Sequence, residues 1–334
     1  MSGIEGAAWG LALGDALGAP VEFDSVDDIL ARFPGGPQEP PGPVFRVTDD
    51  TQMALAVGRA LERAFAEGWG PLTFEGALRD EFVAWLHDPE NNRAPGTTCL
   101  RACGGLDRGQ TWRQASIFGS KGCGANMRVT PIGALLALSE DDMAGAAWLQ
   151  AVMTHGHPTG LVASELTALA VRRLLEGAAP YPLLDELITR CTTHRTTYRE
   201  RWVGDLWRRF GAASPEEYIA QGWDETRAVL ERIGPALRSP PPRDACDVGG
   251  EGWIAEEALA TGLYCFLLHP DDGLAAIRRA AVTGGDTDSI CCLAGAFAGA
   301  RLGAGAWPVS WRERCEYREE ILRQVRWAED QVAG

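Results

Sequence analysis

Two clusters of acidic and hydroxyl side chains are the residues of this sequence best suited to chemistry. One is the segment TDDT at residues 48–51, and the other is DTDS at residues 286–289, directly after a Gly-Gly pair. A single cluster of this kind is typical of a helix N-terminus, where one or two such side chains accept hydrogen bonds from backbone N–H groups. Four in a row exceed that need, and adjacent carboxylates repel each other unless a cation compensates them. Two clusters in one chain therefore favour a site for hard divalent cations such as Mg²⁺, Mn²⁺ or Ca²⁺, which prefer oxygen ligands.

Three other segments carry residues that could serve the same site. Glu22 follows a glycine-spaced stretch and a proline, and it is either a reactive carboxylate or an exposed loop residue. The glycine-rich segment 119–128, GSKGCGANMR, offers backbone N–H groups that could hold a phosphate, although the same pattern also forms tight turns. The segment 154–160, THGHPTG, contains two of the five histidines, which either cap a helix or bind a phosphate or ribose.

The elements that must position these segments are helices, because apolar residues recur with helical spacing and no strand pattern competes with them. The sequence predicts an all-α fold, a compact irregular multi-helix bundle. Gly295, Gly299 and Gly303 leave a stripe without side chains on the last apolar segment, so another backbone can approach it closely. The predicted helices span residues 4–18, 51–67, 74–87, 129–139, 143–154, 160–176, 183–192, 198–209, 215–232, 254–268, 271–282, 288–302 and 311–330.

Two proline-rich segments, 33–47 and 233–253, interrupt the helical pattern. Each could be a linker between domains. We expect instead that both are loops of a single domain covering residues 1–334, because the two acidic clusters lie at opposite ends of the chain and make best sense as one site.

Composition narrows the classes of function. The formal charge of −15 argues against an extended nucleic-acid groove, although a nucleic-acid end or a small phosphate-bearing ligand stays possible. The N-terminal stretch lacks the basic region of a signal peptide, and no uncharged apolar run is long enough to span a bilayer. The nine cysteines lack the paired spacing of a zinc site. We therefore expect a cytoplasmic protein with reduced thiols and no contact with a membrane.

Read in order, six segments resemble the ADP-ribosylglycohydrolase family. They are GD-x-x-G-x-x-x-E, TDDT, G-x-G-x-x-M-R, TH, GW-x-A-E-E and GGDTD, and they run from about Gly10 to Gly303. The resemblance implies an all-α fold around a binuclear metal cleft that holds two divalent cations, Mg²⁺ or Mn²⁺. It implies the following metal ligands: Thr48, Asp49, Asp50, Asp286, Asp288 and Ser289.

The same resemblance implies a hydrolase that cleaves the ribose C1″ N- or O-glycosidic bond and releases ADP-ribose from a modified protein, nucleic acid or small conjugate. Glu22 or a metal-bound aspartate would move protons, which makes Glu22, Asp49, Asp50 and Asp286 the expected catalytic residues. The expected ligand-binding residues are Gly122, Cys123, Gly124, Arg128 and His155. Arg128 either contacts the ligand or only braces the glycine-rich loop, and Cys123 stands where other members have Asn. Two alternatives remain: a structural member like the lens crystallins of the family, and an ADP-ribose-binding or regulatory protein without turnover.

Overall fold

The structure, a computed structural model, describes residues 2–333 and confirms the all-α prediction. Within this range, β-type pairing is limited to three isolated bridges, which join Phe45 to Cys315, Ile117 to His155 and Gly122 to Ile254. None of the helices in the described part of the chain is both long and apolar enough to cross a membrane.

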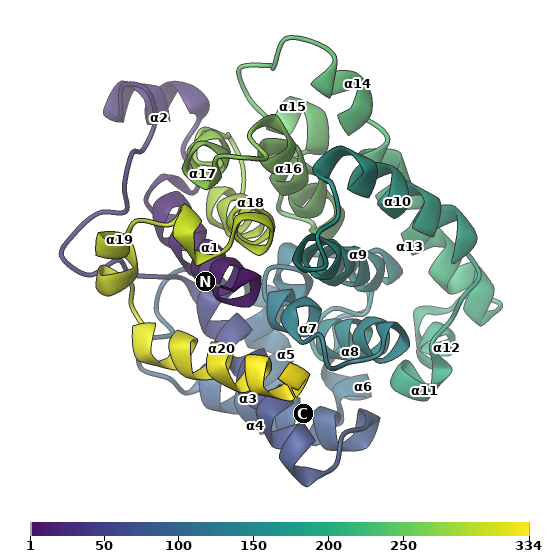
Figure 1. Cartoon of the computed structure of the whole chain (residues 1–334). Helices are drawn as coiled ribbons and strands as arrows, with labels where there is room; N and C mark the ends of the chain where they lie inside the picture. The colour runs from purple at the N-terminus through teal and green to yellow at the C-terminus, as the bar shows by residue number, and fades with distance from the viewer. Residues whose placement is uncertain (1, 334) are drawn as a thin grey trace.

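The helices follow one another through short loops and three single turns of 3₁₀-helix (Figure 1). The 3₁₀ turns cover Ala19–Val21, Cys123–Ala125 and Ala304–Ala306. The α-helices are α1 (Gly3–Gly18), α2 (Val26–Arg32), α3 (Asp49–Glu67), α4 (Pro71–Leu86), α5 (Thr97–Asp107), α6 (Trp112–Ala115), α7 (Thr130–Ala134), α8 (Glu140–Val152), α9 (Pro158–Leu175), α10 (Pro180–Thr193), α11 (Glu200–Val203), α12 (Leu206–Phe210), α13 (Pro215–Leu230), α14 (Ile233–Leu237), α15 (Cys246–Gly249), α16 (Ala255–Leu268), α17 (Gly273–Ala280), α18 (Thr287–Leu302), α19 (Val309–Arg314) and α20 (Arg318–Ala333).

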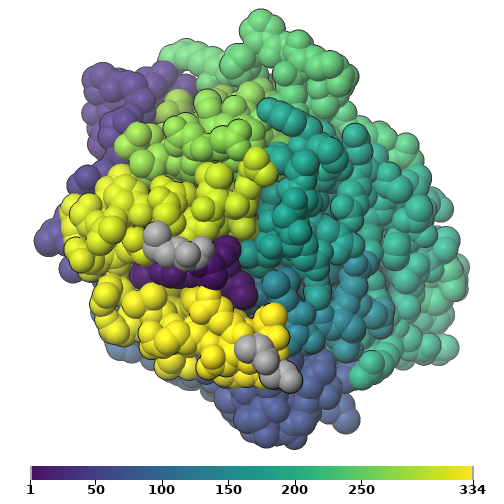
Figure 2. Space-filling view, viewed as in Figure 1, coloured from purple at the N-terminus to yellow at the C-terminus, as the bar shows by residue number. Residues whose placement is uncertain are grey.

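The centre of the molecule is a pair of helices from opposite ends of the sequence, α1 and α18. Figure 1 shows them side by side, with α16 and α17 beyond α18 and α20 beyond α1, and these neighbours pack directly against the pair. Figure 2 shows α1 only as a narrow purple strip between yellow segments near the C-terminus. Nearly all side chains of α1 and α18 are buried, so both helices lack the polar face of a surface helix.

Glycines bring the backbones of α1 and α18 into direct contact. The two helices run antiparallel, with Gly6 beside Gly299, Gly10 beside Gly295, and Gly18 beside Thr287. A Cβ atom added to Gly10 would lie 1.9 Å from the carbonyl oxygen of Gly295, so no side chain fits between the helices there. This confirms that the glycine stripe of residues 288–302 faces another backbone. The sequence did not predict that this backbone would belong to α1.

Five helices of the structure, α2, α5, α6, α14 and α15, fall where the sequence predicted none. α5 buries Cys99, Cys103 and Leu106 on one face, but its two glycines and its short length hide the helical pattern. α2 covers seven residues and begins at Ser25, whose side chain accepts a hydrogen bond from the backbone N–H of Asp28. The proline-rich segment 233–253 contains the short helices α14 and α15.

Three predicted helices are broken or much shorter in the structure, and one of them, predicted over 311–330, is divided into α19 and α20. The helix predicted over 129–139 is only α7, because the chain leaves the helical conformation at Leu135 and Ser139 then caps α8. The helix predicted over 198–209 is the pair α11 and α12, which separate at Gly204, where φ is +57°. A positive φ is incompatible with a continuous right-handed helix.

Candidate active site

The first acidic cluster begins α3 and is held in place by Asp15 of α1. Thr48 is the N-cap of α3, and its hydroxyl accepts a hydrogen bond from the backbone N–H of Asp50. The carboxylate of Asp15 accepts hydrogen bonds from the backbone N–H groups of Thr48 (3.0 Å) and Thr51 (3.2 Å), and from the Thr51 hydroxyl. Thr48, Thr51 and Asp15 thus build the turn, and Asp49 and Asp50 are left free to face the cleft.

Asp15 is a residue of the site that the sequence analysis missed. It is completely buried in α1, on a helix whose other buried residues are apolar or glycine. A lone carboxylate in such a helix needs a polar partner, and this was the signal available in the sequence. Its partners could not be named from the sequence, because they lie on α3.

The second acidic cluster begins α18, and its aspartates are more than helix caps. Asp286 occupies the N-cap position, yet its side chain accepts no capping hydrogen bond. Its backbone N–H donates to the carbonyl oxygen of Glu251 (2.7 Å), which fixes the turn before the helix. The Asp288 carboxylate accepts a hydrogen bond from the backbone N–H of Ser289 (2.9 Å). Helix capping alone therefore does not account for this cluster.

The two clusters meet in one cleft with Glu22. Carboxylate oxygens of Glu22, Asp286 and Asp288 lie within 4.8 Å of one another. Asp49 and Asp50 line the same cleft, which has a volume of about 380 Å³. The close contact of α1 with α18 explains this arrangement, since Glu22 follows the C-terminal end of α1 and Asp286 precedes the N-terminal end of α18.

The electrostatics of the cleft are those of carboxylates that lack a positive partner. Burial and repulsion from Asp288 raise the pKa of Glu22 to about 9 and the pKa of Asp49 to about 7. The same two causes hold the pKa of Asp50 and the pKa of Asp286 well above the usual range. Oδ2 of Asp50 is buried without a hydrogen-bond partner among the described residues. Buried, mutually repelling oxygens of this kind fit a divalent cation.

The glycine-rich loop and His155 also line the cleft. The loop approaches the ring closely, because a Cβ atom on Gly122 would lie 3.2 Å from Nε2 of His155. Nδ1 of His155 is 2.7 Å from the hydroxyl of Thr154. Burial and the positive charge of Arg128 hold the pKa of His155 well below its usual range, so the ring is neutral. Gly124 and Cys123 also line the cleft.

Residues before and within α16 hold this loop in position. The backbone N–H of Cys123 donates to the carbonyl oxygen of Trp253 (3.0 Å), and Lys121 pairs with Glu225 (2.9 Å) and with Glu256. Glu256 therefore anchors the glycine-rich loop.

Two predicted site residues, Thr48 and Arg128, do not line the cleft. Arg128 is completely buried, and its guanidinium donates to the side chain of Gln150 (2.7 Å) and to the hydroxyl of Thr154 (2.7 Å). This geometry favours the second of the two roles considered for Arg128, bracing rather than direct contact with the ligand. Because Thr154 in turn contacts His155, Arg128 braces the histidine from behind.

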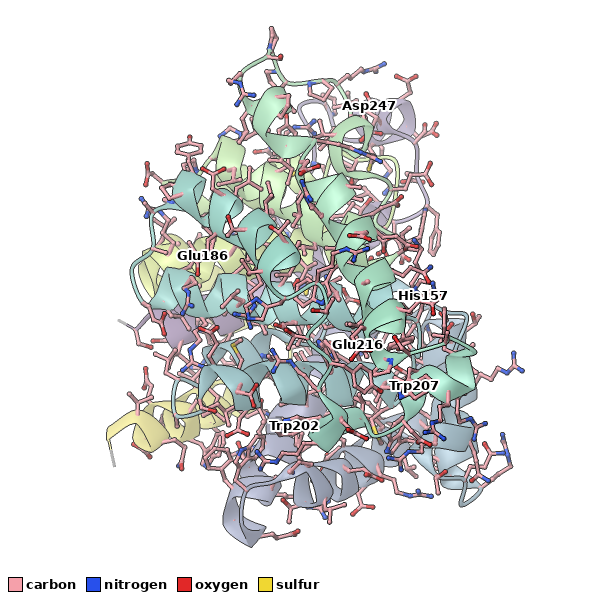
Figure 3. The ribbon with its side chains drawn as sticks, turned by 90° about the vertical axis from the view of Figure 1, so that its right-hand side faces the viewer. His157, Glu186, Trp202, Trp207, Glu216 and Asp247 are labelled. Carbon is pink, nitrogen blue, oxygen red and sulfur yellow. The ribbon has the colours of Figure 1, made fainter. Side chains whose placement is uncertain are left out.

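The second histidine of the segment 154–160 has a structural position. His157 is the N-cap of α9, and its Nδ1 accepts a hydrogen bond from the backbone N–H of Thr159 (3.2 Å). Figure 3 shows it at the surface near Trp207, and its ring lies 5.4 Å from that of Phe210. His157 does not line the cleft.

Comparison with known proteins agrees with the motifs. The family described as ADP-ribosylglycohydrolase matches residues 2–333. The chain belongs to this family. It is 29% identical to an ADP-ribosylhydrolase ARH3 of Homo sapiens, over 97% of this chain and 92% of that protein. It is 27% identical to an ADP-ribosyl-[dinitrogen reductase] glycohydrolase of Rhodospirillum rubrum, over 96% of this chain and 93% of that protein.

A solved structure supports the same assignment. The chain resembles an ADP-ribosylglycohydrolase-related protein complex with a TM-score of 0.66 and 26% sequence identity, covering 99% of this chain and 98% of that one. As a member of the ADP-ribosylglycohydrolase family, the chain has the family fold over almost its whole length, and the all-α prediction agrees with that fold.

Proposed function

We propose that this chain is a divalent-metal-dependent ADP-ribosylglycohydrolase that cleaves the bond between ribose C1″ and a nitrogen or oxygen of its acceptor. The observation that carries the proposal is the convergence of two distant acidic clusters on one cleft, where Asp50 has a buried oxygen without a partner. Glycosidase-family relatives and the glycine-rich loop in the same cleft support it.

The acidic residues suit two divalent cations, Mg²⁺ or Mn²⁺. Their ligands would come from the two clusters: Asp49, Asp50, Asp286, Asp288 and Ser289, which line the cleft, and Thr48, the N-cap of α3, which does not line it. Bound cations would supply positive charge that polarises the ribose hydroxyls and lowers the pKa of bound water. Without the cations, ionised carboxylates at these positions would be unfavourable. Burial and mutual repulsion raise the pKa of Asp50 and Asp286, so these carboxyl groups keep their protons at neutral pH.

The chain's own residues supply proton transfer and orientation. Glu22, whose pKa is raised to about 9, would carry the proton that the leaving nitrogen or oxygen needs as its bond to an oxocarbenium-like C1″ breaks. Thr154 accepts a hydrogen bond from Arg128, and its hydroxyl oxygen lies 2.7 Å from Nδ1 of His155, so the two residues hold the ring in place. In the tautomer that carries its proton on Nε2, His155 would donate that proton to a diphosphate oxygen beside the backbone of Gly122.

The test measures free ADP-ribose released from conjugates on arginine, serine and glutamate peptides and on DNA and RNA ends, with Mg²⁺ or Mn²⁺ present. We expect Asp286→Asn and Asp50→Asn to lower kcat by about 10²-fold or more on whichever conjugate is cleaved. Without metal both carboxyl groups are already protonated at neutral pH, so the melting temperature of each metal-free variant should stay close to that of wild type. Asp185→Asn, at an exposed position of α10, is the matched control and should behave as wild type.

Two outcomes would contradict the proposal. Full activity of both cleft variants at saturating metal would remove the acidic clusters from the reaction. Tight binding of ADP-ribose with no release from any conjugate would instead support a binding protein without turnover.

A further inference from the structure

A second hollow adjoins the cleft at Glu22. It has a volume of about 680 Å³ and is lined in part by the proline-rich segment 41–47, so we call it the proline hollow. Figure 1 shows the chain between α2 and α3 running along the edge of the molecule next to α19. Glu22, Phe23 and Ala94 line both the cleft and the proline hollow, whereas the glycine-rich loop lines only the cleft. The two spaces therefore meet at Glu22, and the proline hollow opens away from the glycine-rich loop.

The backbone at this junction is held in an unfavourable conformation. Phe23 has φ of +71° and Ala94 has φ of +53°, and across residues 2–333 the one other non-glycine residue with positive φ is Tyr317. Left-handed φ costs energy for a residue with a side chain, and such strain gathers where function requires it. Here it keeps the ring of Phe23 68% exposed, stacked 5.5 Å from the ring of Trp253 at the mouth of the cleft.

We propose that the proline hollow binds the polypeptide that carries the ADP-ribose group, and that it selects acceptors with an apolar or aromatic residue beside the modified one. The inference rests on the proposed function. If the diphosphate lies in the cleft beside Gly122 and His155, the bond to be cleaved lies near Glu22. The acceptor then extends from Glu22 into the space that the glycine-rich loop does not line.

The walls of the proline hollow favour an apolar group. Pro41, Pro43 and Val44 line it together with Phe23, and both Val44 and Phe23 belong to the small set of large apolar side chains that the described residues leave exposed. Covering these side chains with an apolar residue of the acceptor would remove their surface from water, which is favourable.

The charges around the proline hollow disfavour a nucleic-acid acceptor. Two arginines line it, and carboxylates already neutralise both. Arg46 pairs with Glu90 (2.7 Å), while Arg93 pairs with Glu90 (2.6 Å) and Glu316 (2.5 Å). A nucleic-acid backbone needs cations that are free to replace its counterions. Two arginines matched by two carboxylates do not provide them.

The experiment uses two ADP-ribosylated peptides that differ only beside the modified residue, where one has Phe and Leu and the other has two serines. Wild-type protein should have the lower KM for the apolar peptide. Val44→Asp should raise that KM about tenfold, as expected when one apolar contact is replaced by a carboxylate. The KM for the serine peptide and the Kd for free ADP-ribose should stay unchanged.

Two further variants separate binding from folding. Val309→Asp makes the same substitution at a similarly exposed valine outside both spaces, and it should match wild type. Phe23→Gly removes the ring and suits the positive φ, so it should raise the KM for the apolar peptide without lowering the melting temperature. A lower melting temperature in Phe23→Gly would mean that the ring serves the fold instead.

The possible results distinguish the two proposals. The role of the proline hollow is overturned if ADP-ribose is released from both peptides with equal KM, or if Val44→Asp keeps the wild-type preference. In either case the proposed hydrolase function still holds. Faster release from a DNA or RNA end, or from a small conjugate without flanking residues, also overturns the role of the proline hollow. Release from no conjugate at all overturns the proposed function and the inference together.

Discussion

Replacing Gly295 by alanine tests how α1 and α18 set the geometry of the cleft. The added Cβ atom would lie 2.0 Å from the carbonyl oxygen of Gly10, whereas ordinary contact begins at 3.4 Å. The helices would have to separate by about 1.4 Å, because a backbone carbonyl cannot rotate away as a side chain can. Overpacking of a buried site costs about 1–3 kcal/mol, and we expect the upper end here, about 3 kcal/mol.

This cost translates into a measurable change in melting temperature. A chain of 334 residues has an unfolding entropy of about 0.7 kcal/mol/K, so Gly295→Ala should lower the melting temperature by about 4 °C. Scanning calorimetry of metal-free protein measures this directly. Gly76→Ala is the control, since Gly76 is an exposed residue of α4 with open space around it. That change should leave the melting temperature unchanged or raise it slightly.

Alanine substitutions at the two ends of the α1–α18 contact should have different effects on metal binding. Gly6 and Gly18 both contact α18, but Gly18 lies beside Thr287 at the start of the second acidic cluster. Gly18→Ala should therefore weaken metal binding in calorimetric titration, whereas Gly6→Ala should lower only the stability. A melting temperature for Gly295→Ala within 1 °C of wild type would refute the expected steric clash, because it would show that a Cβ atom fits between the backbones of α1 and α18.

Three further predictions concern the residues around the cleft. Asp15→Asn removes the charge that holds the turn before α3, so it should cost about 2 kcal/mol in a denaturant titration and weaken metal binding. Without metal, the native carboxyl groups with raised pKa, such as Glu22 at about 9 and Asp49 at about 7, bind more protons than the unfolded chain does. Stability should therefore fall as the pH rises from about 4 to about 9, and added Mg²⁺ should reverse the trend; a flat profile would contradict it. Arg128→Lys keeps the positive charge but loses hydrogen bonds to Gln150 and Thr154, so it should lower the free energy of unfolding by about 3 kcal/mol, measured by thermal unfolding. The same variant should raise the Kd for ADP-ribose. An unchanged Kd would show that ligand binding does not depend on the bracing of His155 by Arg128.

The sequence predicted best those features that follow from a local pattern of residues alone. The acidic clusters and the glycine stripe are of this kind, because their chemical properties do not depend on which distant segments pack against them. The segments TDDT and GGDTD held more oxygens than a helix cap uses, which indicated a cation site. The prediction that they share one site rested on the presence of two such clusters and on the family resemblance, and both clusters line one cleft. The glycines of residues 295–303 likewise predicted close backbone contact.

Features that depend on distant partners were beyond the sequence. Asp15 acts through Thr48 and Thr51, and only the packing of α1 against α3 brings them together. The exposed pair of Phe23 and Trp253 joins residues far apart in the chain, and nothing in the sequence indicated that their rings would stack. Arg128 matched a ligand-binding motif, yet its direction was set by Gln150 of α8.

The contact between α1 and α18 also has a consequence for how the chain folds during synthesis. Gly10 can contact Gly295 only after Gly295 has left the ribosome, which happens 285 residues later. At about 5–20 residues per second, the delay is roughly 15–60 s. Throughout that time the glycine face of α1 has no partner, and contacts of such long sequence separation form slowly. The cleft therefore cannot form until both α1 and α18 have left the ribosome, so it forms later than the parts of the molecule that are built from earlier segments alone.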